Sequence, residues 1–111
     1  MTDECVMYAG TIGLELVTKE RLEQIDKHGR TIELDQANND TGQLIQAAKT
    51  LLGDVNTRAY ANVPYKWDKK WWERMINKDY KERLIIAAAL IVAEIDRISY
   101  KTKVDNPKAN V

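Results

Sequence analysis

The longest apolar stretch of the chain constrains its fold more than any other feature. It runs for ten residues, from Leu84 to Ala93, and contains only leucine, isoleucine, valine and alanine. A membrane-spanning helix needs about 20 such residues, so this stretch is too short to cross a bilayer. It is apolar on nearly all sides of a helix, and such a helix is usually the buried centre of a bundle. We therefore predict an all-α, small helical bundle around a central C-terminal helix that runs from about Asp79 to Tyr100.

A first helix is predicted from about Gly13 to His28. Isoleucine, leucine and valine recur through this stretch at near-helical spacing, with polar residues gathered between them. Gly29 then supplies a stop, because glycine readily adopts the left-handed conformation found at helix ends. Residues 30–40 are polar and include a dense turn signal, Asn-Asn-Asp at 38–40, so we predict a connecting loop there.

Two shorter helices are predicted in the middle of the chain. One starts at a cap formed by Asp40 or Thr41 and ends at Gly53. The other covers residues 67–77, where three tryptophans and a methionine lie mostly three to four positions apart. Between them, residues 54–66 lose the helical period and predict a long loop. At the end of the chain, residues 101–111 are expected to form a flexible tail.

The size and charge of the chain limit the classes of function. With 111 residues it forms a single domain, with an ordered core at about 12–100. Acidic and basic residues number 17 each, so neither nucleic acid nor a membrane is an expected partner. Cys5 is the only cysteine, which excludes an internal disulfide and a cysteine-based zinc site. Because the N-terminal residues also lack a signal-peptide pattern, we expect a cytoplasmic protein.

The broad apolar surface of the last helix also predicts self-association. A unit of three principal helices would leave part of the face between Leu84 and Ala93 poorly covered. We therefore expect a homo-oligomer, most simply a two-fold dimer.

Three glutamates are candidates for binding a metal ion. Glu20 and Glu23 lie three positions apart and share a face of the first helix, and Glu94 on the last helix could join them. Such carboxylates can hold Mg²⁺ through hard oxygen ligands. Asp96 cannot face the same site as Glu94, because residues two apart point to opposite sides of a helix. The alternative is that Glu20 and Glu23 are solvated surface residues, with Glu20 near a cap at Thr18.

Two arginines of the last helix are candidates for binding a phosphorylated ligand. Arg83, Glu94 and Arg97 fall on one stripe of this helix, at either end of an apolar segment. A guanidinium group binds phosphate or carboxylate with two parallel hydrogen bonds, so Arg83 and Arg97 could hold such a group. The alternative is an internal ion pair of Arg97 with Glu94 or Glu20.

The only histidine and the tryptophans could complete a small-molecule site. His28, at the end of the first helix, could bind a ligand or simply interact with the helix dipole. Flat indole rings can stack on a nucleobase, but aromatic residues at helical spacing are more often part of the core. We assign Trp71 or Trp72 to the core and select Trp67, beside the predicted loop, as the stacking residue.

Five short motifs are spread over about residues 13–99. They are Lys19-Glu20-Arg21-x-x-Gln24-Ile25, Gly29-x-Thr31-x-Glu33-x-Asp35, Gly42-Gln43-Leu44 with Ala47-Ala48, the element from Pro64 to Trp67, and Ala87-Ala88-Ala89-Leu90-Ile91-x-Ala93-Glu94-Ile95-Asp96-Arg97. Taken together, these motifs resemble a group of small helical proteins that are common in phages and prophages and are largely uncharacterised. The motifs are specific only as a set.

More distantly, the chain resembles the all-α, MazG-type nucleoside triphosphate pyrophosphatases. The resemblance implies paired helical acids that bind Mg²⁺ at a dimer interface. Glu20-Arg21-Leu22-Glu23 could match the first Glu-x-x-Glu element of that family, but the second element, Glu-x-x-Asp, is missing. Three or four oxygen ligands are therefore hard to assemble, which favours binding of a nucleotide over metal-assisted hydrolysis.

Three classes of function remain open. The first is a phage-type protein that binds a nucleotide or nucleotide-derived signal without a metal or other cofactor and sequesters a host defence signal. Its ligand-binding residues would be His28, Glu33, Asp35, Trp67, Arg83 and Arg97. The second is a Mg²⁺-dependent pyrophosphatase that uses Glu20, Glu23 and Glu94, with Asp35 as a further candidate. The third is a non-catalytic module that binds another protein.

Overall fold

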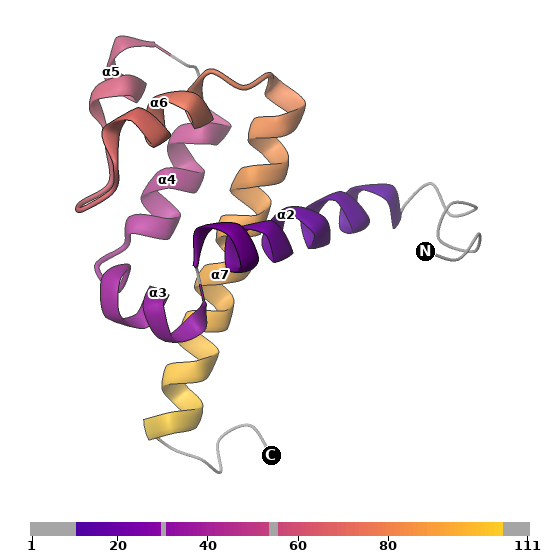
Figure 1. Ribbon diagram of the computed structural model, residues 1–111, viewed down its shortest axis with the longest axis vertical. Coiled ribbons are helices and arrows are strands. Elements are labelled where there is room, and N and C mark those ends of the chain that lie inside the picture. Colours follow the sequence, from indigo (N-terminus) through magenta and orange to yellow (C-terminus); the bar gives the residue numbers. More distant parts are fainter. Residues whose placement is uncertain (1–10, 30, 54–55, 106–111) are drawn as a thin grey trace.

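A computed structural model describes residues 11–29, 31–53 and 56–105, and the side chains of all of these except 101–105. These residues form six helices and no strand (Figure 1). The expectation of an all-α fold is thus confirmed. Cys5 and residues 106–111 of the expected tail lie outside the described residues.

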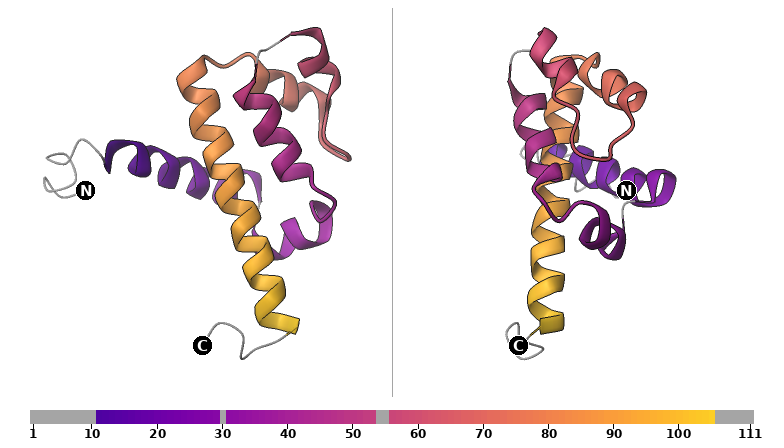
Figure 2. Two further views of the ribbon diagram at one scale, coloured as in Figure 1. Left: turned by 180° about the vertical axis from the view of Figure 1, so that it is seen from behind. Right: turned by 90° about the vertical axis from the view of Figure 1, so that its left-hand side faces the viewer.

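The last helix, α7 (Tyr80–Asp105), is the central element. It packs against α4 (Gln43–Leu52), α2 (Ile12–His28) and α3 (Ile32–Asn38). In the side view of Figure 2, α4 and α7 form one layer, and α2 and α3 lie on one side of it. The helix continues past its predicted end at Tyr100, because residues 101–105 remain helical.

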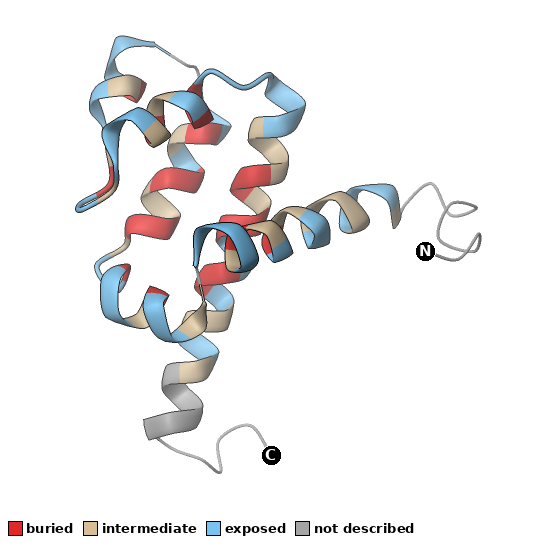
Figure 3. Ribbon diagram, in the orientation of Figure 1, coloured by how far each residue is buried: buried red, intermediate tan, exposed pale blue. Residues whose placement is uncertain are grey.

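The hydrophobic core lies mainly between α4, α6 and α7, as the buried residues in Figure 3 show. Its fully buried large side chains include Leu44, Leu51, Trp72 and Leu90. Alanines contribute as well, because Ala47 and Ala87 are completely buried and small side chains let two helices approach closely. The central position predicted for the last helix is therefore correct, although one of its sides remains exposed.

Helix α4 ends as predicted but begins differently. Its N-cap is Gly42, with a φ of 89°, and not Asp40 or Thr41. The side chain of Gln43 folds back instead, so that its amide oxygen accepts a hydrogen bond from the Thr41 N–H at 2.9 Å. Glycine suits this cap because it alone adopts the left-handed region without a steric cost.

Two short helices replace parts of the predicted loops. Helix α3 begins after Thr31, whose hydroxyl accepts a hydrogen bond from the Leu34 N–H at 3.3 Å. Helix α5 (Thr57–Ala61) begins after Asn56, whose side chain accepts hydrogen bonds from two backbone N–H groups. Both segments are polar and short, so no apolar period marks them in the sequence. Only their caps carry a signal.

Helix α6 (Lys69–Ile76) brings the tryptophans to the core. Asp68 caps it, because its carboxylate accepts a hydrogen bond from the Trp71 N–H at 2.8 Å. Trp72 is fully buried, and its indole N–H donates to the carbonyl oxygen of Ala59 at 2.8 Å. Trp67 lies before the cap in an irregular turn, so the predicted helix over residues 67–77 is shorter at both ends.

Helix α2 crosses α7 and extends away from the rest of the bundle (Figure 1). Arg21 is buried where the two helices meet and pairs with Asp96 at 3.5 Å. Thr18 is not a cap, because its hydroxyl donates to the Leu14 carbonyl oxygen within the helix at 2.8 Å. In the described part of the chain, no helix is long and apolar enough to cross a membrane.

Candidate functional site

One cavity brings together three of the six residues predicted to bind a ligand. It has a volume of about 460 Å³ and contains His28, Asp35 and Trp67. We call it the aromatic pocket. It is lined by His28, Gly29, Leu34, Asp35, Asn38, Asn39, Lys66, Trp67, Asp68 and Trp71. Its volume falls within the range of about 300 to 1,000 Å³ that is typical of small-molecule sites.

Ends of helices and turns form the walls of the aromatic pocket. His28 is the last residue of α2, and Gly29, with a φ of 64°, reverses the chain towards α3. The histidine ring lies against Trp71 of α6, with 5.2 Å between ring centroids and an interplanar angle of 46°. The ring of Trp67 also contacts Trp71, with 5.7 Å between ring centroids. Three flat rings from different segments are thus adjacent in one wall.

A chain of side-chain hydrogen bonds joins Asp35, Asn39 and Trp67, which all line the aromatic pocket. Asp35 is completely buried and accepts a hydrogen bond from the side-chain amide of Asn39 at 2.8 Å. The amide oxygen of Asn39 in turn accepts the indole N–H of Trp67 at 2.8 Å. This chain links α3 to the turn before α6, and so holds the Trp67 ring in one orientation. Asp35 therefore acts on the pocket mainly by positioning Asn39 and Trp67.

Lys66 is the one lysine among the residues that line the aromatic pocket. Its φ of 69° makes it the one non-glycine residue with a positive φ in the described segments. The conformation closes a turn in which the Trp67 N–H donates to the Pro64 carbonyl oxygen at 3.0 Å. Non-glycine residues in this region cost energy and occur often at functional sites. The Lys66 ammonium group lies 5.4 Å from the centroid of the Tyr65 ring.

Sequence reasoning did not select Asn39, Lys66 or Trp71 as ligand-binding residues. In the sequence, Asn39 is part of a turn signal, and Trp71 or Trp72 is predicted to belong to the core. Trp71 in fact does both, since it packs against the core and lines the aromatic pocket. The Pro-Tyr-Lys-Trp motif was the available signal for Lys66, because a lysine next to an aromatic residue in a loop can face a ligand.

The structure places the other predicted ligand-binding residues outside the aromatic pocket. Arg83 donates from Nη1 to the carbonyl oxygens of Leu51 at 3.0 Å and Gly53 at 3.1 Å, at the C-terminal end of α4. Glu33 is exposed in the first turn of α3 and does not line this pocket. Arg83 thus binds carbonyl groups that the end of a helix leaves without intrahelical partners.

Arg97 forms the internal ion pair that was the alternative to ligand binding. Its guanidinium group pairs with Glu94, one turn earlier on α7, and also donates to the Gln36 side chain of α3 at 3.1 Å. The hydrogen bond to Glu94 raises the pKa of Arg97 above its usual value. Both side chains of the pair are largely buried, so Arg97 joins α7 to α3 as a structural residue.

Two of the three predicted metal ligands lie in one small cavity. Glu20 and Glu23 line a space of about 130 Å³ together with His28, Trp71, Lys78 of the turn between α6 and α7, and other residues of α2, α6 and α7. Burial raises the pKa of the half-buried Glu20, although a hydrogen bond from the Gln24 amide at 3.2 Å acts in the opposite direction. The third predicted ligand, Glu94, is held by Arg97. Among the described side chains, no group of three or more histidine, cysteine, aspartate or glutamate residues is arranged to hold a metal ion.

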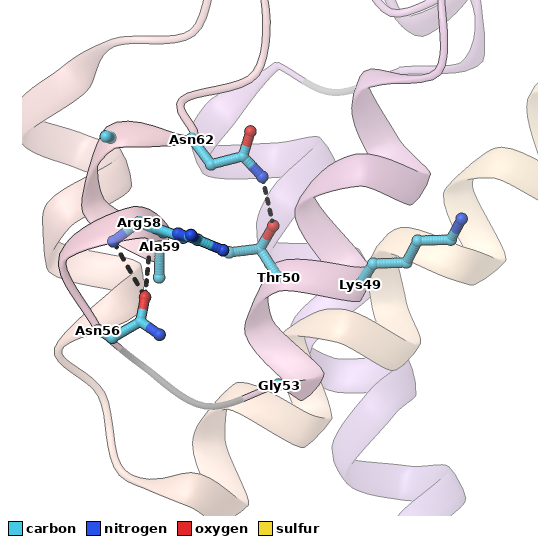
Figure 4. A pocket seen from close by; sticks show the side chains of 8 residues that line it. Lys49, Thr50, Gly53, Asn56, Arg58, Ala59 and Asn62 are labelled. Carbon is cyan, nitrogen blue, oxygen red and sulfur yellow. Dashed lines mark hydrogen bonds between the residues drawn. The ribbon is translucent and has the colours of Figure 1, made fainter.

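A second surface cavity is larger but chemically different. It has a volume of about 500 Å³ and lies between the end of α4 and α5 (Figure 4). Asn56 caps α5, and Asn62 donates to the Thr50 hydroxyl at 2.9 Å, so the amides that line the cavity already hold the protein together. Lys49 extends away from the other side chains in Figure 4. The aromatic pocket is therefore the stronger candidate for a ligand site.

Comparison with known proteins adds no further assignment. The sequence matches no protein-family model, and neither curated proteins nor solved structures show a significant match to the chain.

Proposed function

We propose that the chain binds a nucleotide or nucleotide-derived small molecule in the aromatic pocket, without a metal ion. The observation that carries this proposal is the convergence of His28, Trp67 and Trp71 with a lysine in one open cavity. A nucleotide combines a flat base with an anionic phosphate. The pocket offers matching features, because aromatic rings stack on bases and a lysine ammonium group attracts phosphate.

Each part of the ligand would have its own partner in the pocket. The base would lie against the indole of Trp71 or Trp67, and the phosphate would lie near Lys66. The amide of Asn38, which also lines the pocket, can donate and accept hydrogen bonds at the edge of a base. Lys66 would take the place of Arg83 and Arg97 as the residue that binds the phosphate. The resemblance to phage proteins suggests the biological purpose, which is the sequestration of a nucleotide-derived defence signal of the bacterial host.

Binding can be tested with a thermal-shift panel of nucleoside triphosphates, cyclic dinucleotides and ADP-ribose derivatives, with and without Mg²⁺. Any stabilising compound is then recovered and analysed by chromatography. We expect a shift that does not need Mg²⁺, with the compound recovered intact. No shift with any compound would contradict the proposal and favour a protein partner instead.

Two variants locate the binding site, each with a matched control. We expect His28→Ala and Lys66→Gln to weaken binding of a stabilising nucleotide about tenfold or more, because each removes a group that lines the pocket. The controls are Lys27→Ala, next to His28 on α2, and Lys69→Gln at the start of α6. Both control residues are exposed and do not line the aromatic pocket. If the control variants weaken binding as much as the pocket variants, the ligand binds elsewhere.

One observation favours a second candidate, a Mg²⁺-dependent nucleoside triphosphate pyrophosphatase. Glu20 and Glu23 share a small cavity, and His28 and Trp71 line both this cavity and the aromatic pocket. A base in the larger cavity would therefore place its phosphates within reach of two carboxylates, which could hold Mg²⁺. This candidate predicts that a triphosphate is recovered as a monophosphate, and that Glu20→Gln or a chelator abolishes turnover.

A further inference from the structure

One side of α7 carries large apolar side chains that no described segment covers. Ile91 is 37% exposed, Val92 36%, Ile95 57% and Ile98 50%. Seen from behind in Figure 2, α7 lies in front, and α2 passes behind it. The other sides of α7 bury Ile86 and Leu90. Only part of the circumference of α7 therefore faces the core, although its stretch from Leu84 to Ala93 contains apolar residues alone.

The exposed side follows the spacing of a coiled coil. Leu84, Ala88, Ile91, Ile95 and Ile98 are separated by alternate steps of four and three residues. The average spacing of about 3.5 residues keeps these side chains in one line along the helix, so that a second helix can pack against them. Leu84 and Ala88 are partly buried, and the other three are exposed. We call these five residues the α7 seam.

We propose that the α7 seam binds the α7 seam of a second copy of this chain, with the two helices antiparallel. Successive seam residues, continued to position 102, are four, three, four, three and four residues apart. This series of spacings is the same whether the helix is followed from its N-terminal or its C-terminal end. An antiparallel pair can therefore align the seam in one register, in which Leu84 of one copy lies opposite position 102 of the other, where the sequence has a threonine. In this register Ile91 of one copy lies opposite Ile95 of the other.

The sizes of the seam residues favour this register. Ala88 of one copy lies opposite Ile98 of the other, so that a small side chain meets a large one. In a parallel pair, Ala88 would face Ala88 and leave a gap, while Ile98 would face Ile98. Alternation of small and large residues across an interface lets side chains fill the space between the helices.

The charges favour the same orientation. No charged residue occupies a seam position between Leu84 and Ile98. The next seam position before Leu84 is Lys81, and the antiparallel register places it opposite position 105, where the sequence has an aspartate. A parallel pair would instead bring each of these positions next to its own copy, with like charges together. Both ends of the seam are thus complementary only when the helices run in opposite directions.

This dimer would leave the candidate ligand site accessible. The aromatic pocket is built from residues of α2, α3 and α6 and the turn before α6. These elements lie on one side of the layer of α4 and α7 (Figure 2). On that side α7 contacts α2 through Asp96 and α3 through Arg97, and neither residue belongs to the seam. The inference does not depend on which molecule the pocket binds, and failure of one proposal leaves the other unchanged.

The first test measures self-association of the full chain by sedimentation equilibrium. We expect the wild-type protein to form a dimer and Ile95→Lys to weaken dimerisation by at least about tenfold, because the variant buries two like charges in the seam. Leu14→Lys on α2 is the matched control, since Leu14 is a more exposed apolar residue outside the seam. A monomeric wild type, or equal weakening by both variants, would overturn the proposal. Circular dichroism confirms that each variant is folded.

The second test determines the orientation by disulfide cross-linking in a Cys5→Ser background. Ile91→Cys and Ile95→Cys proteins that carry tags of different size are mixed and oxidised. The antiparallel register predicts that the cross-link forms mainly between the two variants, because positions 91 and 95 face each other. If each variant instead links mainly to itself, the helices are parallel and the proposed register is wrong.

Discussion

The sequence makes residues of the aromatic pocket and the two arginines of α7 candidates for one ligand, but the structure places the arginines outside the pocket. Arg83 binds the last carbonyl groups of α4, and Arg97 neutralises the buried Glu94. In the aromatic pocket, by contrast, the side chains of His28 and Lys66 line an open volume. The comparison shows that charged residues on a largely buried helix form hydrogen bonds and ion pairs with neighbouring groups of the protein. Groups at helix ends and in turns remain available for a ligand.

The largest expected effect is on stability, from the substitution Arg97→Met. It would leave the largely buried carboxylate of Glu94 without its counter-charge, and would cost about 3 to 5 kcal/mol of unfolding free energy. Urea denaturation followed by circular dichroism measures this cost. If Arg97 instead served a ligand, Arg97→Met would weaken binding and change stability little.

A double variant sharpens this prediction. Arg97→Met combined with Glu94→Met removes both charges together, and should recover most of the lost stability, because a buried ion pair can often be replaced by apolar residues of similar volume. Recovery would show that the unpaired carboxylate causes the loss. A double variant no more stable than Arg97→Met would contradict the ion-pair explanation.

A smaller loss of stability is expected for Arg83→Met. The variant keeps much of the apolar stem but loses the hydrogen bonds to the carbonyl groups of Leu51 and Gly53. These carbonyls lie near solvent, so water can replace part of the interaction, and the expected cost is about 1 to 2 kcal/mol. The same urea titration measures it, and nucleotide binding should be unchanged. If the fully folded variant binds nucleotide more weakly than wild type, Arg83 is a ligand-binding residue.

The smallest expected effect is an increase in stability from Glu20→Gln. Burial raises the pKa of Glu20 in the folded state, so folding favours the protonated carboxyl group. This contribution to stability is present below the pKa of the unfolded chain and is lost as the pH rises through the higher, folded-state pKa. At neutral pH the uncharged glutamine should therefore stabilise the fold, by no more than about 0.5 kcal/mol for this half-buried residue.

The pH dependence provides the measurement for Glu20. Melting temperatures of the two proteins should be similar near pH 4 and should separate towards pH 7, with Glu20→Gln the more stable. Glu23→Gln is a matched control on the same helix. If the separation runs in the opposite direction, the Glu20 carboxylate is stabilised by a partner in the fold.

The helical architecture could be predicted because its signals are local. The apolar run of α7, the period of α4 and the stop at Gly29 each depend on residues close together in the sequence. Helices α3 and α5 escaped prediction because they have seven and five residues. Such short helices bury too few side chains to show a period, so their side-chain caps at Thr31 and Asn56 are the main evidence.

The candidate site could be predicted only in part, because it depends on contacts between distant segments. His28 and Trp67 were recognisable from their position at the edges of helices. Their link through Asn39 joins residues that are 28 positions apart, and no sequence pattern marks it. The partners of Arg83 are equally distant, because it binds carbonyl groups of residues 30 and 32 positions earlier. The pair of Arg97 with Glu94 lies within one turn of α7, and the sequence offered it as an alternative.

The most direct test of the central claim compares nucleotide binding by two variants that the structure separates. Isothermal titration with the most stabilising compound of the nucleotide panel is carried out on wild type, His28→Ala and the double variant Arg97→Met, Glu94→Met. The account predicts that His28→Ala binds at least about tenfold more weakly, while the double variant binds like wild type. Loss of binding in the double variant with normal binding by His28→Ala would contradict it, and would place the ligand at the arginine stripe of α7.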